Sequence, residues 1–396
     1  MKDEVLKKAA ISLIIFLLLL GLLEFGFRIR RSAIFRELPS APDSAEGFGD
    51  LRGFLDYVKK LGDAQSFFYG TGAIYSPYTV TALKPNFGFK TKNIDYTTNS
   101  FGFRSKEMIV PKPKGDFRVF ILGGSTVEGG FNEKWMISSY LEEELKKIIP
   151  SAEVINAGVV GYFSQQELAL LETEISDLEP DLVIIFDGRN DLYYSILPDW
   201  KGRKNGDYFA NQRILDSFVN YPSLRSLLAY DAKVLIKKSA FLTDLFRVAF
   251  RRHDFKVYPE NARIKEAAID LYLNNLKIEK EILDNKNIKG LFVFQPTLGY
   301  CKDNLSSYEN SVLEYFRAVE KTNWIDQVKE YWPRVGKLMA DIPDSQNVKI
   351  SDLSCLFKDF KNTAYVDGVH YVPESYRLIA ERLAKIIENN FLPKTL

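Results

Sequence analysis

Histidine and cysteine are scarce in this chain, which limits the chemistry that its side chains can supply. The 396 residues include two histidines and two cysteines. Cys301 and Cys355 lack the close spacing of metal-ligand pairs, so no metal site is expected. The two cysteines are either buried free thiols or partners in one disulfide. Because a single bridge is rare in a domain of this size, free thiols are the expectation.

An excess of either charge is also missing. The chain has 53 Lys and Arg residues against 52 Asp and Glu residues, and its formal net charge is +1. This balance supplies no field that would attract a polyanion, so nucleic acid is not expected as a partner. The hydrophobic share of 46% is ordinary for a folded protein. The length predicts one main domain of about 250 residues with appendages.

One long apolar run stands near the N-terminus. Residues 9–23 carry no charge, and the run reaches residue 27 if Glu24 is tolerated, which makes about 28 Å of helix. The residues that follow contain no small-x-small cleavage site, so an uncleaved single-pass membrane anchor over residues 1–31 is favoured over a cleaved signal peptide. Lys and Arg flank the run on both sides, and the positive-inside rule therefore leaves its orientation open.

The rest of the chain divides into an appendage and a regular domain. Residues 32–116 are expected to form a linker and a strand-rich appendage, because aromatic and Thr-rich pieces there are broken by Gly and Pro. Between residues 117 and 396, short apolar runs alternate with segments of helical periodicity. Strands are predicted at 118–122, 153–156, 181–186, 290–294 and 348–351, and helices at about 134–149, 164–178, 262–286, 307–339 and from 373. This alternation predicts an α/β fold with three α/β/α layers around a central parallel sheet.

The alternation breaks at about 198–261, where a helical insertion is expected. Lys and Arg are interleaved there with Leu, Val and Phe. The segment is either a peripheral insertion with a solvated basic face, or a cap that shapes a substrate entrance or rests on anionic lipid. His253 lies in this insertion beside cationic neighbours that disfavour its protonation, so it is expected to be an exposed loop residue.

Ser125 follows the first strand of the regular domain, at the edge where open α/β sheets bind their ligands. Gly123 and Gly124 precede it and would let the chain turn sharply with the hydroxyl exposed. The pattern is not the Gly-x-Ser-x-Gly elbow, because Val127 stands at the position of the second glycine. Taken alone, a structural turn explains Gly-Gly-Ser-Thr equally well.

Two further segments follow the next two strands. Gly161 lies just before Ser164 and Glu167, which are expected to form a capping box, so its amide would sit in a strand-to-helix turn. Asn190 follows the third strand in Asp-Gly-Arg-Asn-Asp and could present its side-chain amide to developing negative charge. Either segment by itself is also explained as an ordinary turn.

His370 is nearly the only candidate for a general base. It follows Asp367 by three residues, just before a proline that is expected to start the last helix. A carboxylate on the same loop would orient the imidazole. The residue types of a Ser-His-Asp arrangement are therefore present, at the ends of predicted strands or before a helix.

In this order, Ser125 in Gly-Gly-Ser, Gly161 in Gly-x-x-Gly, Asn190 in Gly-x-Asn-Asp, and Asp367-x-x-His370 resemble the four blocks of the SGNH hydrolases, also called GDSL-type esterases and lipases. The resemblance covers about residues 117–392 and implies a flavodoxin-like α/β/α domain. Gly124 departs from the family, since it replaces the acidic residue of Gly-Asp-Ser. This change keeps the nucleophile but puts in doubt any substrate preference taken from the family.

The resemblance implies a role for each of these residues. Ser125 would attack an acyl carbonyl, His370 would accept and return the proton, and Asp367 would hold the imidazole. The backbone amides of Ser125 and Gly161 and the side chain of Asn190 would bind the oxyanion. No metal or organic cofactor is required. Residues that flank these positions would line a sugar or acyl pocket or would serve ordinary packing: Gly124, Tyr162, Arg189, Tyr193 and Tyr371.

The expected function is therefore that of a membrane-anchored O-acyl ester hydrolase with an extracytoplasmic domain. An acetyl ester on a surface glycan is the first expectation for the substrate, and a lipid ester is the second. Two alternatives remain, namely O-acyl transfer to a polysaccharide by the same triad and a non-catalytic scaffold that binds carbohydrate or lipid. The sequence leaves the oligomeric state open.

Overall fold

The computed structural model describes residues 72–90, 95–129, 133–195, 263–320 and 324–392, together with six helical positions between Leu19 and Gly26. These six positions lie in a different unit from the other described residues. Most of the predicted anchor, the linker before residue 72, and the insertion at 198–261 with His253 lie outside the described residues. Within the part of the chain that the structure describes, no helix has the length and apolar character needed to cross a membrane.

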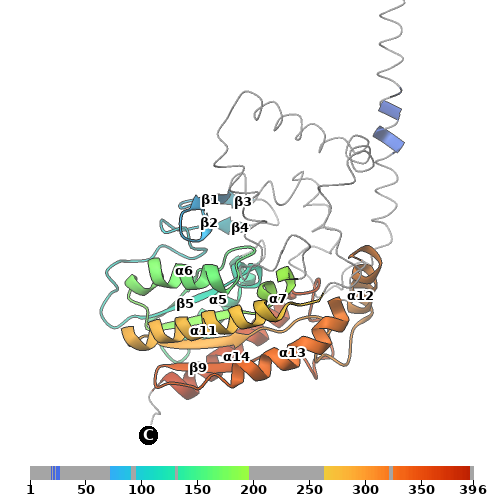
Figure 1. The fold of residues 1–396 in the computed structure, drawn as a ribbon. Helices are drawn as coiled ribbons and strands as arrows, with labels where there is room; N and C mark the ends of the chain where they lie inside the picture. Colours follow the sequence, from blue (N-terminus) through green and yellow to red (C-terminus); the bar gives the residue numbers. More distant parts are fainter. Residues whose placement is uncertain are drawn as a thin grey trace, which may run out of the picture. The chain divides into compact units, whose positions relative to one another are not determined.

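The main unit is built on five parallel strands. In chain order these are β5 (Phe117–Gly123), β6 (Ala152–Asn156), β7 (Leu182–Asp187), β8 (Lys289–Phe294) and β9 (Val348–Asp352). The spatial order is β6-β5-β7-β8-β9, which is the 2-1-3-4-5 order of flavodoxin-like sheets. Figure 1 shows this unit, with β5 and β9 of the sheet labelled. The predicted α/β class with a central parallel sheet is confirmed. The chain order reverses on either side of β5, so ligand-binding loops are expected there.

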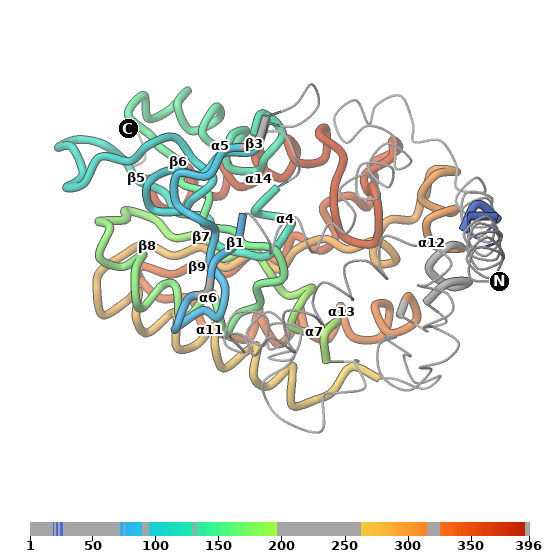
Figure 2. Tube along the Cα trace, turned by 90° about the horizontal axis from the view of Figure 1, so that it is seen from above, coloured from blue at the N-terminus to red at the C-terminus, as the bar shows by residue number. Residues whose placement is uncertain are grey.

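Successive side chains along each strand pack alternately into two apolar cores, one on each face of the sheet. On β5, Phe120 and Leu122 point into one core, and Val119 and Ile121 point into the other. Side chains of α6, α11 and α13 complete the first core, and those of α5, α12 and α14 complete the second. Figure 2 shows α5 and α14 on one side of the strands and α6 and α11 on the other. Because both faces are covered, the central strand β7 is buried throughout and almost continuously apolar.

The helices lie where the periodicity predicts them, except that one predicted helix is divided into two. Their bounds are α4 (Ser125–Glu128), α5 (Ile137–Lys146), α6 (Ser164–Thr173), α7 (Arg189–Ser195), α11 (Glu266–Lys286), α12 (Ser307–Glu320), α13 (Trp324–Ala340) and α14 (Pro373–Phe391), with short 3-10 turns at Glu133–Trp135 and Ile175–Asp177. The single helix predicted over 307–339 is therefore wrong, since α12 and α13 occupy that range. The two helices contribute mainly to opposite cores, which one straight helix could not do.

The predicted capping box is also wrong. The N-cap of α6 is Phe163, and no side chain caps it from within the helix. Instead, the Asp191 carboxylate of α7 accepts the backbone N–H of Ser164 at 3.2 Å and the Ser164 hydroxyl at 2.5 Å. A tertiary contact thus supplies the acceptor that the local pattern assigned to Ser164 itself.

Two small antiparallel sheets precede the main domain. They pair β1 (Ala73–Ser76) with β2 (Val80–Leu83), and β3 (Gly88–Lys90) with β4 (Asp95–Thr97). The next residues return to the main sheet, where the Arg104 N–H donates to the carbonyl of Asn156 at 3.1 Å. The Phe103 ring also packs edge-on against Phe120 of β5, with ring centroids 5.8 Å apart. Strands are thus present in the predicted strand-rich region, while the domain boundary at 116 stays a prediction.

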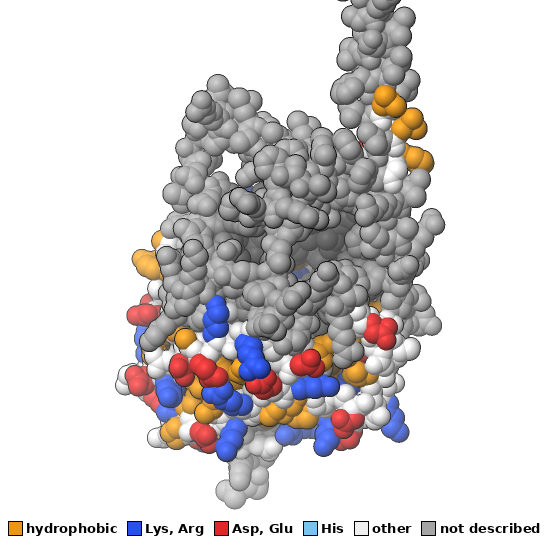
Figure 3. Space-filling model, turned by 45° about the vertical axis from the view of Figure 1, so that its right-hand side comes forward, with side chains coloured by type: hydrophobic (Ala, Val, Ile, Leu, Met, Phe, Trp, Pro, Cys, Tyr) orange, Lys and Arg blue, Asp and Glu red, His pale blue; other side chains and the backbone are white. Residues whose placement is uncertain are grey.

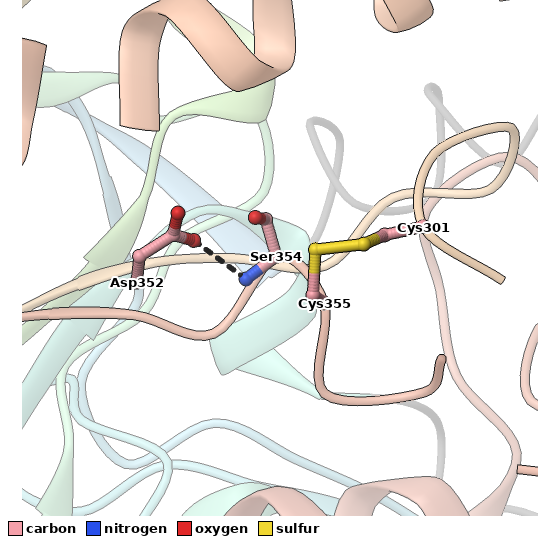
Figure 4. Close-up of a disulfide and its surroundings, with 4 residues drawn as sticks. All are labelled: Cys301, Asp352, Ser354 and Cys355. Atoms are coloured by element: carbon pink, nitrogen blue, oxygen red, sulfur yellow. Dashed lines mark hydrogen bonds between the residues drawn. A yellow bond between two sulfur atoms is a disulfide. The ribbon is translucent and has the colours of Figure 1, made fainter. Parts of the chain in front are cut away.

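The cysteines form a disulfide, so the expectation of free thiols is wrong. Cys301 and Cys355 have Cα atoms 5.0 Å apart, and they join the loop after β8 to the loop after β9 (Figure 4). Beside the bridge, the backbone N–H of Ser354 donates to the Asp352 carboxylate at 2.8 Å. The pairing of β8 with β9 brings the two loops together at one end of the sheet. This proximity outweighs the rarity of a lone bridge on which the expectation rested.

Candidate active site

Ser125 is the first residue of α4, a helix of one turn that follows β5 directly. Gly124 precedes it with an extended backbone, at φ −81° and ψ −150°. Three bonds close the helix: the N–H groups of Val127 at 3.1 Å and Glu128 at 3.0 Å donate to the Gly124 carbonyl, and the Gly129 N–H donates to the Ser125 carbonyl at 3.0 Å. Ser125 therefore lies at the carboxyl edge of the sheet, where the strand order reverses.

The structure brings His370 and Asp367 to this serine. The Ser125 hydroxyl lies 2.8 Å from Nε2 of His370, and Nδ1 of His370 lies 2.6 Å from Oδ2 of Asp367. The side chains of His370 and Asp367 are 29% and 27% exposed, so solvent and small molecules reach the group. Hydroxyl, imidazole and carboxylate form one continuous hydrogen-bonded chain, which is the geometry of a Ser-His-Asp triad.

The loop that carries His370 is held by its own bonds before any substrate arrives. Oδ1 of Asp367 accepts the backbone N–H groups of Val369 at 2.8 Å and His370 at 2.7 Å. The Val366 N–H closes the loop onto the carbonyl of His370 at 2.9 Å. The segment after β8 also binds the loop, because the Thr297 hydroxyl donates to the Gly368 carbonyl at 3.1 Å. The imidazole is therefore positioned by backbone contacts on both sides.

The protonation states of Asp367 and His370 suit His370 to act as a general base. Partial burial raises the pKa of Asp367, but the charge and hydrogen bonds of His370 outweigh it, and the net pKa lies below the usual range. Burial lowers the pKa of His370, while the Asp367 carboxylate raises it more, so the net pKa lies above 6.5. With Asp367 ionised, the Nδ1 proton of neutral His370 points to the carboxylate. Nε2 is then the nitrogen that accepts the Ser125 proton.

The N–H groups predicted to bind an oxyanion are those of Ser125, Gly161 and Asn190. The amide of Ser125 stands at the first helical position, where a helix offers no carbonyl partner. Gly161 is the third residue of a turn closed by the Tyr162 N–H on the Val159 carbonyl at 3.1 Å, and its φ of +79° suits glycine. The N–H of Gly161 takes no part in that closing bond. The Asn190 amide donates one hydrogen to the Tyr162 carbonyl at 2.7 Å and has a second hydrogen to give.

The glycine that departs from the family pattern has a physical reason here. A Cβ atom on Gly124 would lie 2.5 Å from Nδ2 of Asn190 and 3.1 Å from the carbonyl oxygen of Tyr162. An aspartate in this position would collide with the amide of Asn190. Gly124 therefore lets Asn190 approach the serine turn closely.

The residues predicted to line a pocket divide into two groups. Tyr162 is buried, and its hydroxyl donates to the Thr81 carbonyl. Tyr371 is fully buried, and its hydroxyl donates to the carbonyl of Pro296 at 2.7 Å. The rings of these two tyrosines belong to the protein core, which favours the alternative of ordinary packing for them.

Arg189 and Tyr193, the other two candidates with side chains, pair with each other. The guanidinium lies 4.0 Å from the ring centroid of Tyr193, and Arg189 is 8% exposed. The charge of Arg189 also lowers the pKa of His370, as the smallest of five influences. Both residues therefore lie near the site, and a contact of Gly124, Arg189 or Tyr193 with substrate stays a prediction.

A buried charged group beneath α4 was not found from the sequence. Arg104 is fully buried and stacks on Tyr96 with 3.9 Å between the guanidinium carbon and the ring centroid. It lies 3.7 Å from the Glu128 carboxylate, which is also buried. Burial raises the pKa of Glu128 to about 7, although Arg104 lowers it. The available sequence signal was Glu128 itself, an acidic residue in the turn after the nucleophile.

A cluster of buried carboxyl groups lies on the α6 and α11 side of the sheet. Its members are Glu167, Asp187 and Glu279, which are buried, and Asp191, which is partly buried. Burial raises the pKa of each, and repulsion among them adds to the shift for all but Asp191, whose pKa rises to about 6. Tyr272 donates its hydroxyl to Asp187 at 2.7 Å. In the described ranges, no group of three His, Cys, Asp or Glu side chains is arranged to hold a metal ion.

No family model matches this sequence, and no curated protein matches it. Solved structures to which the chain is similar include an acetyl xylan esterase, at 16% identity over 68% of this chain and 100% of that one, with a TM-score of 0.39. A lipase/acylhydrolase from Enterococcus faecalis is 14% identical over 71% and 100% of the two chains, with a TM-score of 0.37. A GDSL-like lipase from Bacteroides thetaiotaomicron is 15% identical over 71% and 92%, with a TM-score of 0.35. The contacts of Ser125, His370 and Asp367, rather than these likenesses, carry the proposal that follows.

Proposed function

We propose that this protein is a serine-dependent hydrolase of acyl esters. One observation carries the proposal: the Ser125 hydroxyl lies 2.8 Å from Nε2 of His370, whose Nδ1 lies 2.6 Å from the Asp367 carboxylate. A serine in contact with an oriented, partly exposed imidazole is an activated nucleophile. The N–H groups around Ser125 support acyl chemistry, because a carbonyl under attack develops negative charge on its oxygen.

The reaction would proceed in two steps through an acyl-enzyme. Ser125 Oγ attacks the carbonyl carbon of the ester while His370 takes its proton, and the oxyanion is held by the amides of Ser125 and Gly161 and the side chain of Asn190. Collapse of this intermediate breaks the bond to the alcohol, which leaves with the proton from His370. Water then attacks the acyl-enzyme in the same way and releases the acid.

For the substrate we propose an acetyl ester on a carbohydrate. A lipid ester is the second candidate. The resemblance of the four sequence blocks to the SGNH hydrolases supports this class. A panel of acetylated oligosaccharides and p-nitrophenyl esters of rising chain length tests it. Faster turnover of long acyl chains than of acetylated sugars would favour the lipid ester.

We also propose that the domain is extracytoplasmic and that the N-terminal residues anchor it to a membrane. The disulfide between Cys301 and Cys355 supports an oxidising compartment. A C-terminal alkaline phosphatase fusion would be active if the domain is exported, and an inactive fusion at normal expression would oppose this location. Retention of the fusion in washed membranes, and its release on removal of residues 1–31, tests the anchor.

The decisive test of the hydrolase is covalent labelling by a fluorophosphonate. Wild type should be labelled, and Ser125→Ala should not. Ser311→Ala is the matched control, since Ser311 lies on α12 and its hydroxyl bonds only its own helix at the Ser307 carbonyl. Absence of labelling in the folded wild type would contradict the proposal and favour a binding scaffold.

Acyl transfer would use the same chemistry with a sugar hydroxyl in place of water. Release of p-nitrophenol from an acetyl donor should be unchanged by an added glycan if the enzyme is a hydrolase. An increase that depends on the glycan, with appearance of the acylated product, would assign transfer instead.

A further inference from the structure

The one-turn helix that carries Ser125 ends in carbonyl groups that its own backbone does not satisfy. A helix leaves its last carbonyls without partners, and in α4 these belong to Val127, Glu128 and Gly129 at the end of the turn. The Arg104 guanidinium accounts for two of them, because its Nη1 donates to the carbonyls of Glu128 at 2.7 Å and Gly129 at 2.8 Å. The Asn156 amide donates to the third, at Val127, at 2.7 Å.

Arg104 is itself held on several sides. Its side chain has no exposed surface, its guanidinium stacks on Tyr96, and the Glu128 carboxylate lies 3.7 Å away. Its backbone N–H bonds the carbonyl of Asn156, at the end of β6. The arginine is therefore a rigid link between β6 and the helix of the nucleophile, and it comes from the region before the α/β domain.

The position of Ser125 depends on so few backbone bonds that this link matters for catalysis. Three backbone bonds close the turn, from the N–H groups of Val127 and Glu128 to the Gly124 carbonyl and from the Gly129 N–H to the Ser125 carbonyl. The hydroxyl must also stay 2.8 Å from Nε2 of His370, and a misplacement of about 1 Å can lower a rate about a hundredfold. We propose that Arg104 is a positioning residue for Ser125, which caps the carbonyl end of α4 and holds the nucleophile in line with His370. The inference rests on the proposed hydrolase function.

The charge of Arg104 has a second consequence. Among the groups that act on Glu128, Arg104 and Tyr96 favour its ionised form, and the charge of His370 does so more weakly. Among those that act on His370, Asp367 and Glu128 raise its pKa and Arg189 lowers it. Without the arginine, Glu128 would stay neutral to a higher pH and would raise the pKa of His370 less. The acid limb of kcat/KM would therefore move to lower pH.

The test compares Arg104→Lys and Arg104→Gln with Arg118→Lys. Arg118 is the matched control, since it is also fully buried and donates to two backbone carbonyls, those of Leu178 at 2.9 Å and Ile109 at 2.7 Å. It stands at the opposite end of β5, away from Ser125. Lysine keeps the charge at either site but lacks the planar guanidinium, which at Arg104 stacks on the Tyr96 ring while it donates to the two carbonyls.

The measurements are kcat and KM for p-nitrophenyl acetate across pH, the rate constant of fluorophosphonate labelling, and urea unfolding. We expect Arg104→Lys to lower kcat and the labelling rate by about tenfold to a hundredfold, with KM within about twofold of wild type. Arg104→Gln should show the same loss and also the shifted acid limb. Arg118→Lys should lose stability while kcat and the labelling rate stay near those of wild type.

Equal labelling rates in the folded Arg104→Lys and Arg118→Lys proteins would overturn the inference. A loss of kcat that follows the unfolding midpoint in both would overturn it as well. Either result leaves the hydrolase function standing, provided that wild type is labelled and Ser125→Ala is not. Should Arg104→Gln fail to fold, the comparison of the two lysine variants decides alone.

Discussion

Asp367 holds both the backbone and the ring of His370, and this double role makes it the most informative single residue of the site. One of its oxygens accepts two backbone N–H groups of its own loop, and the other accepts the imidazole. A substitution that removes the charge of Asp367 but keeps its shape would therefore change the pKa of the imidazole more than the conformation of the loop. The pKa of His370 is raised mainly by this carboxylate, against the lowering effect of burial.

For this residue we predict that Asp367→Asn lowers kcat/KM by about 10⁴-fold and that His370→Ala has a comparable effect. His370 must be neutral to accept a proton, so wild-type kcat/KM should rise with pH and reach half its maximum above pH 6.5. In Asp367→Asn the residual activity should reach half its maximum at a lower pH. Initial rates from pH 5 to 9 measure both quantities.

Asp359→Asn serves as the control, because Asp359 is exposed on the surface and has no contact with His370. Its rates and pH profile should match wild type. Undiminished activity in Asp367→Asn, or a midpoint that does not move, would contradict the assigned role of the carboxylate.

The elements around the site meet so closely that glycine is required where they cross. A Cβ atom on Gly158, in the loop after β6, would lie 2.4 Å from the backbone nitrogen of Glu128 and 2.8 Å from the side chain of Val127. Both atoms belong to α4, so any side chain at 158 pushes the nucleophile helix. Backbone atoms cannot move aside as a flexible side chain can.

We therefore predict that Gly158→Ala shifts α4 and slows fluorophosphonate labelling at Ser125 by at least about tenfold. Overpacking of this kind should also lower the free energy of unfolding by about 1–3 kcal/mol. Labelling kinetics and urea unfolding measure the two effects. Gly88→Ala is the control, since a Cβ there meets only a methyl group of Thr97 at 3.9 Å. Labelling of Gly158→Ala at the wild-type rate would show that α4 tolerates the displacement.

Stability of the whole molecule should depend on pH through its buried carboxyl groups. Glu279 of α11 is fully buried, and burial, followed by repulsion from Asp187 and Asp191, raises its pKa well above 4.5. Glu167, Asp187 and Asp191 in the same cluster also have raised pKa values. Well below pH 3.8 both the folded and the unfolded chain hold these protons, and the unfolded aspartates begin to release theirs near that pH. As pH rises above 4.5, the unfolded chain releases them first, so the free energy of unfolding falls.

The substitution Glu279→Gln removes one ionisable group from this cluster and nearly keeps its shape. We predict that it raises the urea midpoint relative to wild type more at pH 8 than at pH 4. Glu281→Gln, on the exposed side of the same helix, should change the midpoint equally little at both values. The reverse order for Glu279→Gln would mean that its carboxylate is ionised and stabilised in the folded protein.

Surface charge contributes little to such effects on the face that Figure 3 shows. Among the described residues on this face, Lys, Arg, Asp and Glu side chains are interspersed without a continuous region of one sign. Exposed ion pairs such as Arg334 with Glu266 are worth about 0–1 kcal/mol each. The balanced composition therefore shows itself as mixed charge on this face.

Elements with a strong local pattern were predictable from the sequence alone. The apolar runs of the five strands and the stripe of α14 follow from local periodicity, which depends only on neighbouring residues. Ser125, Gly161, Asn190, Asp367 and His370 were proposed from the resemblance of four short sequence blocks to the SGNH hydrolases. The structure brings Ser125, His370 and Asp367 into contact, and the oxyanion roles of Gly161 and Asn190 stay predictions. The anchor, the insertion and the domain boundaries stay predictions.

Contacts between distant segments were decided only by the tertiary structure. The Cys301–Cys355 bridge depends on strand order, the cap of α6 comes from Asp191, and Arg104 reaches α4 from a different segment. Burial of Tyr162 and Tyr371 likewise depends on what packs over them. Sequence periodicity reports which side of an element is apolar, while the partner on that side is set by the fold. The residues of the candidate site could thus be read from the sequence, and the groups that hold them could not.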